Sequence, residues 1–79
     1  IMEQTTLSNA HRGDRCVVLD VASEPAELKS RLYSLGIIPG SVLELLRFAP
    51  LGDPMQIKIG GCFISIRKSE AQIISVDIQ

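Results

Sequence analysis

Residues 55–67 read Met55-Gln56-Ile57-Lys58-Ile59-Gly60-Gly61-Cys62-Phe63-Ile64-Ser65-Ile66-Arg67, and they contain the clearest alternation of apolar and polar side chains in the sequence. Successive strand residues point to opposite faces of a sheet, so each half of this stretch has one apolar face. A Gly-Gly pair between two such runs is typical of a tight β-hairpin. The stretch therefore predicts two antiparallel strands joined by a short turn.

Three more segments around this hairpin have the pattern of strands. Residues 14–21 read Asp-Arg-Cys-Val-Val-Leu-Asp-Val, a β-branched apolar run that begins after the turn residue Gly13. Residues 41–49 are mainly apolar, and residues 74–78 alternate again with Ile, Val and Ile. Residues 68–71 fit a short turn or a single helical turn. We expect five strands in all.

Residues 25–35 change period and predict a helix. Leu28, Leu32 and Leu35 fall at i, i+4 and i+7, which places them on one helical face. Pro25 suits the first helical turn, and Gly36 is placed to end the helix in the left-handed conformation. The pattern predicts a helix of about three turns between the first and second strands.

These elements predict a mainly β fold, a small antiparallel barrel of about five strands with one inserted α-helix. Closing a sheet on itself hides the strand edges that would otherwise recruit other chains. Periodicity alone does not separate an SH3-like barrel from an OB-like one. At 79 residues the chain has room for a single domain, spanning 1–79. We interpret Ile1, which precedes a plausible initiator Met2, as a leftover of recombinant expression.

The composition argues against several classes of protein. Hydrophobic residues make up 46% of the chain and charged residues 22%, which is not the composition of a disordered segment. The net charge of −1 lacks the basic surplus that drives nucleic-acid binding. No apolar run approaches the ~20 residues needed to span a bilayer, and no signal peptide is present. We expect a cytoplasmic protein without direct membrane insertion.

The sequence carries no recognisable catalytic set. His11 is the only histidine, and the carboxylates are scattered. A phosphate-binding P-loop is also missing, so we expect a protein that is not an enzyme and does not hydrolyse GTP by itself. Tyr33, Phe48 and Phe63 are the only aromatic residues, too few for the usual groove that binds proline-rich peptides.

Metal and cofactor sites are not predicted either. Cys16 and Cys62 lie 46 positions apart in predicted strands, where we expect them to be buried as small hydrophobic side chains. Their spacing is not that of a zinc site. The alternative is weak transition-metal binding at a surface or intermolecular site that uses His11, a cysteine or acidic side chains.

Two segments are candidates for partner docking. In the first, Tyr33, Ile37 and Ile38 would form a partly exposed apolar edge after the helix, although core packing and turns explain the same residues. In the second, the loop 50–54, two prolines restrict the backbone and hold Leu51 on an exposed tip. The alternative for this loop is an ordinary hairpin connection in which Asp53 accepts hydrogen bonds from nearby amides.

These segments also carry a family resemblance. Residues 31–40, Arg-Leu-Tyr-Ser-Leu-Gly-Ile-Ile-Pro-Gly, resemble the R-L-x-x-L-G-[apolar]-x-P-G segment of the FeoA family. Residues 49–54, Ala-Pro-Leu-Gly-Asp-Pro, resemble its A-P-L-G-D-P loop, and Arg67-Lys68-Ser69-Glu70-Ala71 with Ile74 and Val76 resembles its closing R-x-x-E-A-x-x-I-x-V. The motifs occur in the family's order across residues 31–76. Gly60-Gly61-Cys62 departs from the pattern, since relatives often carry a bulkier or basic residue there.

The resemblance implies an SH3-like barrel and a non-catalytic cytosolic accessory of FeoB, the ferrous-iron transporter with a GTP-binding cytosolic domain. It makes that domain the expected partner and leaves the oligomeric state open. The alternatives are an iron-sensing or iron-delivering metal protein, and a GTPase activator that inserts Arg31 or Arg47. The candidate docking residues are Tyr33, Leu35, Gly36, Ile37, Ile38, Pro39, Gly40, Pro50, Leu51, Gly52, Asp53 and Pro54.

Overall fold

The computed structural model describes residues 3–79; Ile1, and the interpretation we gave it, lie outside this range. Six strands, two α-helices and one 3-10 turn follow one another along these residues. Their bounds are β1 Glu3–Thr6, η1 Leu7–Asn9, β2 Arg15–Val21, α1 Ala26–Ser34, β3 Val42–Phe48, β4 Met55–Ile59, β5 Cys62–Ile66, α2 Lys68–Ala71 and β6 Ile74–Ile78.

The six strands form one antiparallel sheet in the order β1-β6-β2-β3-β4-β5. The mainly β class and the inserted helix are therefore confirmed, and the five predicted strands and α1 agree with the structure to within a residue or two. Within residues 3–79, β1 and β5 do not pair with each other, so backbone hydrogen bonds leave the sheet unclosed.

Strand β1 is an additional strand that the sequence pattern did not predict. Its sequence, Glu-Gln-Thr-Thr, has no apolar alternation that would predict a strand. The strand forms because these residues pair with the end of β6, with Glu3 opposite Ile78 and Thr6 opposite Ser75. Tertiary pairing, rather than a local pattern, produces this strand.

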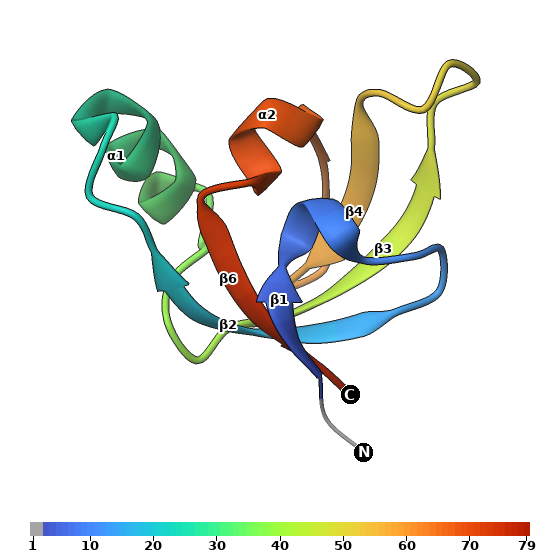
Figure 1. Ribbon diagram of the computed structural model, residues 1–79, viewed down its shortest axis with the longest axis horizontal. Helices are drawn as coiled ribbons and strands as arrows, with labels where there is room; N and C mark the ends of the chain where they lie inside the picture. The colour runs from blue at the N-terminus through green and yellow to red at the C-terminus, as the bar shows by residue number, and fades with distance from the viewer. Residues whose placement is uncertain (1–2) are drawn as a thin grey trace.

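Register shifts bend the sheet at two places. One lies between Val18 and Asp20 in the pairing of β2 with β6, and the other between Leu45 and Arg47 in the pairing of β3 with β4. Bulges of this kind increase the local twist and curl a sheet around its core. In Figure 1, α1, α2 and the loop between β3 and β4 lie at one end of the curled sheet, and β1 lies at the other.

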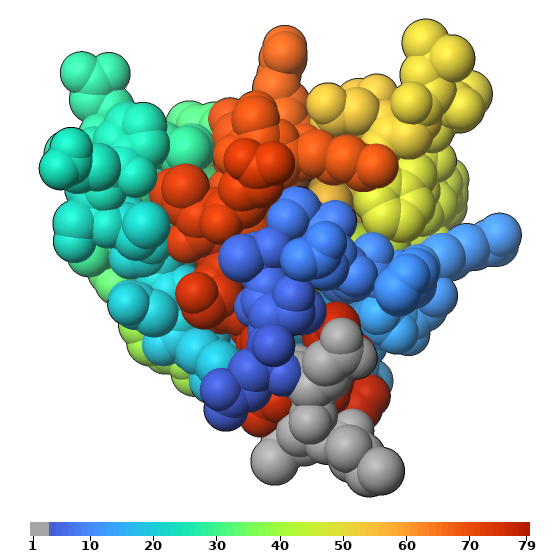
Figure 2. All heavy atoms as spheres, viewed as in Figure 1, coloured from blue at the N-terminus to red at the C-terminus, as the bar shows by residue number. Residues whose placement is uncertain are grey.

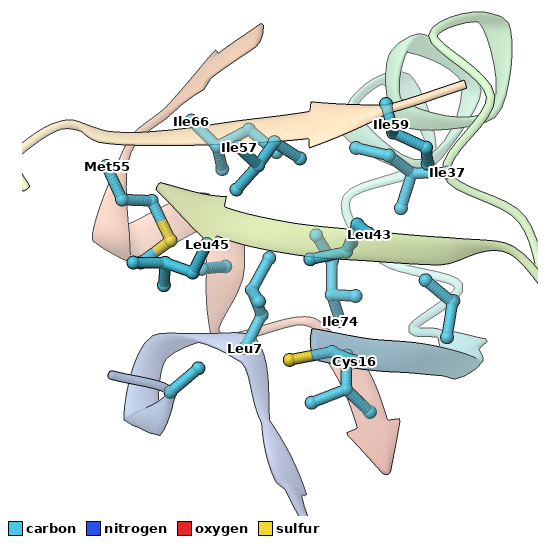
Figure 3. Close-up of a cluster of buried hydrophobic side chains, with 14 of the residues drawn as sticks. Leu7, Cys16, Ile37, Leu43, Leu45, Met55, Ile57, Ile59, Ile66 and Ile74 are labelled. Atoms are coloured by element: carbon cyan, nitrogen blue, oxygen red, sulfur yellow. The ribbon is translucent and has the colours of Figure 1, made fainter. Parts of the chain in front are cut away.

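The core fills the concave side of the sheet. Figure 3 shows side chains from β3, β4 and β5 facing Leu7 of η1 and Ile74 of β6. Each of the largest core side chains is less than 2% exposed, and they are Leu7, Leu32, Ile37, Leu43, Leu45, Met55, Ile57, Ile66, Ile74, Val18, Val21 and Val76. Neither helix among residues 3–79 has the length and apolar character needed to cross a membrane.

Candidate partner-docking surface

The corner that follows α1 has a fixed backbone. The Gly40 N–H donates to the Val18 carbonyl at 2.7 Å, and the Val18 N–H donates to the Ser41 carbonyl at 2.8 Å. The Ser41 hydroxyl donates to the Gly36 carbonyl at 2.7 Å. Gly36 and Gly40 have φ values of 94° and 93°, a region that is strained for residues with a side chain. These bonds hold the predicted docking segment against β2.

Three side chains of this segment form an exposed apolar edge. Tyr33, Leu35 and Ile38 are 38%, 38% and 41% exposed. The Lys29 ammonium lies 5.3 Å from the centre of the Tyr33 ring, which adds a cation to the same surface. The edge predicted from the sequence consisted of Tyr33, Ile37 and Ile38, so Leu35 takes the place of Ile37 in it. The role of this edge in docking stays a prediction.

Ile37 does not belong to this edge, because it is fully buried. The Gly36 N–H donates to the Tyr33 carbonyl and the Ile37 N–H donates to the Leu32 carbonyl, each at 3.0 Å. These two bonds define a Schellman motif, which turns the residue after the glycine back against the helix. Ile37 therefore joins Leu32 in the core, and the expected exposure of Ile37 was wrong.

The second candidate segment, the loop 50–54, is compact and projects from the domain. The Gly52 N–H donates to the Ala49 carbonyl at 2.7 Å, and the Ala49 N–H donates to the Pro54 carbonyl at 2.9 Å. Leu51 is 97% exposed at the tip. The alternative interpretation of this loop expected Asp53 to accept hydrogen bonds from backbone amides. Asp53 does so, because its Oδ1 accepts the Lys68 backbone N–H at 2.9 Å.

The two candidate segments do not form one continuous surface. Figure 1 places α1 and the loop on opposite sides of α2, and Figure 2 shows the orange atoms of α2 between them. The structure instead connects both segments to α2. The loop is bonded to α2 through Asp53, and α1 is bonded to it through an ion pair between the Arg31 guanidinium and the Glu70 carboxylate.

Helix α2 is itself organised by these contacts. Glu70 Oε1 accepts the Arg67 N–H at 3.0 Å while its other oxygen contacts Arg31. The Lys68 ammonium lies 5.0 Å from the centre of the Phe48 ring, beside the loop. The three FeoA-like motifs are thus joined in space through Arg31, Asp53 and Glu70. Arg31 and Glu70 both belong to the FeoA-like motifs, but the motifs alone did not predict that the two side chains meet.

A groove extends the apolar edge toward the β4–β5 hairpin. Its volume is about 380 Å³, and it is lined by Leu35, Gly36, Ser41, Val42, Ile59, Gly60 and Cys62. Val42 is 50% exposed on this surface and was not among the predicted docking residues. Because residues 41–49 are apolar on both faces of the strand, the sequence did not show that the Val42 side chain would be exposed.

The two cysteines have different environments. Cys16 is fully buried, as expected, and burial together with the nearby Asp14 carboxylate raises the pKa of its thiol from 9.0 to about 11. Cys62 is exposed, so the expectation of burial was wrong for this residue. It shares a strand face with Ile66, which is buried, but it begins β5 beside the Gly-Gly turn, where its side chain is exposed although its partner Ile59 is buried.

No group of three or more His, Cys, Asp or Glu side chains gathers within residues 3–79 in a way that could hold a metal ion. His11 is exposed, and its Nδ1 lies 3.7 Å from the Asp14 carboxylate. The same carboxylate accepts the His11 backbone N–H at 2.7 Å, which makes this contact a local turn.

Comparisons with known proteins give the family. The FeoA domain model matches residues 5–78. A solved FeoA structure from Chlorobium tepidum is 44% identical with a TM-score of 0.83, over 94% of this chain and 70% of that one. The zinc-complexed FeoA of Stenotrophomonas maltophilia, described as an SH3 domain protein, is 29% identical with a TM-score of 0.81, over 92% of this chain and 89% of that one.

The chain is also similar to part of a much longer protein. It is 29% identical over 72 residues to a Fe(2+) transport protein A/Fe(2+) transporter FeoB fusion protein of Porphyromonas gingivalis. That match covers 91% of this chain and 8% of the fusion protein. The family match spans nearly all of the chain, and its solved relatives share the SH3-like fold. The chain belongs to the FeoA domain family.

Proposed function

We propose that this chain is a non-catalytic, cytoplasmic accessory of ferrous-iron uptake that acts by contacting the GTP-binding cytosolic domain of FeoB. Membership of the FeoA family supports a role in ferrous-iron transport. The fusion of FeoA and FeoB sequences in one Porphyromonas gingivalis protein supports the choice of partner, because fused domains commonly act together.

The main support for a docking surface is the exposure of Leu51. A leucine that is 97% exposed on a loop closed by its own hydrogen bonds is an apolar anchor already held in place. A preorganised anchor binds with a smaller loss of conformational entropy than a flexible one. The exposed edge of Tyr33, Leu35 and Ile38 would supply a second contact on the other side of α2.

The test is isothermal titration of this protein into the purified cytosolic domain of its cognate FeoB, with and without a GTP analogue. We expect saturable binding that weakens at least about tenfold in Leu51→Asp, because the anchor is replaced by a charge that must be desolvated. Leu19→Asp is the matched control, since Leu19 is 40% exposed on β2 and outside the candidate surface. Equal loss in both variants, or no binding in any nucleotide state, would contradict the proposal.

A second candidate function is metal binding, favoured by the exposed thiol of Cys62 and by the zinc bound to the Stenotrophomonas maltophilia relative. Residues 3–79 hold no cluster of three such ligands, so a site with three or more protein ligands would need some of them from outside these residues. Equilibrium dialysis with Zn(II) and Fe(II) tests it. Stoichiometric binding that Cys62→Ala or His11→Ala abolishes would favour this function.

GTPase activation remains the third candidate. The Arg31 guanidinium is already engaged by Glu70, which makes the exposed Arg47 the freer arginine for insertion into a nucleotide site. Single-turnover GTP hydrolysis by FeoB, measured with the natural protein and with Arg47→Ala, tests this role. A rate that this protein does not change would dismiss it.

A further inference from the structure

Strand β5 has a free backbone edge. It pairs only with β4 in the described part of the chain, and it ends the sheet opposite β1. An uncovered edge strand presents unpaired N–H and C=O groups, and proteins use such edges to bind extended segments of other chains.

The turn geometry shows which backbone groups point outward. Gly60 and Gly61 have φ values of 56° and 84°, and they are the two residues between Ile59 and its partner Cys62. In a two-residue hairpin the closing pair is hydrogen-bonded, and such pairs then alternate along the strands. The N–H and C=O groups of Phe63 and Ser65 therefore face away from β4, toward the free edge.

The side chains along this edge are suited to contact. Phe63 is 72% exposed, and the Lys58 ammonium lies 6.0 Å from the centre of its ring. A depression of about 310 Å³ lies beside the strand, and it is lined by Leu46, Arg47, Gln56, Phe63, Ile64 and Ser65. The depression therefore runs across β3 and β4 to the three β5 residues nearest the middle of the free edge.

Strands β4 and β5 and the residues next to them carry only positive charges, although Glu44 of β3 lies opposite Lys58. Residues 54–69 contain Lys58, Arg67 and Lys68 but no Asp or Glu. Neither Lys58 nor Arg67 forms an ion pair with a carboxylate of residues 3–79. A second copy would bring the same positive charges to this edge, whereas an acidic segment would bring charges that attract Lys58 and Arg67. The edge is complementary to acidic residues.

We propose that the free edge of β5 binds an extended acidic segment of a partner protein, which pairs with Phe63 and Ser65 as an additional strand. Acidic side chains of the segment would lie on the Phe63 face near Lys58, and apolar ones on the Ile64 face. This surface is distinct from the Leu51 loop and does not depend on the proposed contact with FeoB.

The probe is a capped peptide of about eight residues that alternates valine and glutamate, the length of an ordinary strand. A second peptide with lysine in place of glutamate is the charge control. Titration into the isotope-labelled protein is followed by amide NMR. We expect saturable shifts at Phe63 and Ser65 with the acidic peptide only, and slower hydrogen exchange of these two amides.

Matched variants separate backbone pairing from side-chain contact. Ser65→Pro removes the outward N–H and should reduce affinity at least about tenfold, whereas Ser65→Ala keeps that N–H and should bind as the natural protein does. Lys58→Gln should weaken binding about two- to fivefold, with Arg12→Gln as a control outside the edge. Should Ser65→Pro fail to fold, N-methylation of the peptide amides that face β5 tests the same hydrogen bonds.

Three results would overturn the proposal. The first is the absence of saturable shifts at millimolar peptide, and the second is equal binding of the acidic and basic peptides. The third is a dimer in sedimentation equilibrium that Ser65→Pro abolishes, since the edge would then belong to a second copy. Because the titration contains no FeoB, its failure leaves the Leu51 experiment unaffected, and a failure of that experiment leaves this one unaffected.

Discussion

The Asp53 carboxylate accepts a hydrogen bond from the backbone N–H of Lys68 at 2.9 Å, and this bond joins the loop after β3 to the first residue of α2. The Lys68 N–H has no partner within its own helix, because the first amides of any helix lack one. The carboxylate therefore gives the first amide of α2 a hydrogen-bond acceptor. It also restrains the loop that carries Leu51.

Replacing Asp53 tests this double role. Asp53→Ala should lower the free energy of unfolding by about 1 kcal/mol, because the Lys68 amide loses its acceptor. It should also weaken binding to FeoB by loosening the loop. Chemical denaturation and the titration described above measure the two effects. Asp53→Asn retains an acceptor oxygen and is the control; a loss as large as that of Asp53→Ala would show that charge, and not the hydrogen bond, matters.

The Arg31–Glu70 ion pair should contribute little to stability. The two side chains are 51% and 19% exposed, so solvent and salt screen their attraction. A double-mutant cycle with Arg31→Gln and Glu70→Gln should give a coupling energy of about 0.2–1 kcal/mol that shrinks in 1 M salt. Coupling that salt leaves unchanged would mean that the pair is less accessible to solvent than these exposed fractions indicate.

Ile37 and Leu51 were both predicted docking residues, and truncation should distinguish them. Ile37→Ala leaves a cavity in the core and should cost about 2–5 kcal/mol of unfolding free energy. Leu51→Ala should change it by no more than about 0.5 kcal/mol, because the side chain makes few contacts in the folded domain. Thermal unfolding of both variants checks this. A large loss in Leu51→Ala would place Leu51 in the folded interior.

Cys16 should make the stability of the domain fall at alkaline pH. Its thiol has a raised pKa of about 11 in the folded protein, so the unfolded chain loses this proton first, near 9.0. The contribution is present below pH 9 and is lost as the pH rises toward 11, at up to about 1.4 kcal/mol per pH unit. Denaturation from pH 8 to 11 measures the slope, which should be shallower in Cys16→Ala. An identical slope in both proteins would contradict the assigned pKa.

Thiol labelling offers a simpler check on the same environments. At pH 8 a thiol reagent should modify the exposed Cys62 quickly and should reach Cys16 only when the protein unfolds. Cys62→Ala is the control, because it leaves only the slow reaction. Fast modification of two thiols in the folded protein would show that Cys16 is accessible.

Local patterns predicted most of this fold because its central strands and α1 have strong periodicity. The Gly-Gly pair located the β4–β5 turn, and the leucines at 28, 32 and 35 located the helix. Strand β1 was missed because Glu-Gln-Thr-Thr has no pattern of its own and becomes a strand only by pairing with β6.

The candidate surface was predicted less well because exposure depends on contacts between distant segments. Ile37 looked like its exposed neighbour Ile38, yet the residue after a helix-ending glycine packs back on the helix. A glycine placed to end the helix, with apolar Leu32 before it and apolar Ile37 after it, is the pattern of a Schellman motif and predicts that Ile37 is buried. Cys62 was different, because only the three-dimensional structure shows that its side chain is exposed while Ile59, opposite it, is buried.

The pairing of the first and last strands has a consequence for engineering. Glu3 lies opposite Ile78, at the end of the domain away from α1, α2 and the Leu51 loop (Figure 1). A tether or reporter attached next to either residue would therefore lie on the side of the domain away from the surface proposed to contact FeoB. The same proximity suits circular permutation. A short linker from Ile78 back to Glu3 would let new ends be cut at the Gly60-Gly61 turn, which would remove the covalent connection between β4 and β5 and leave all strand pairs in place.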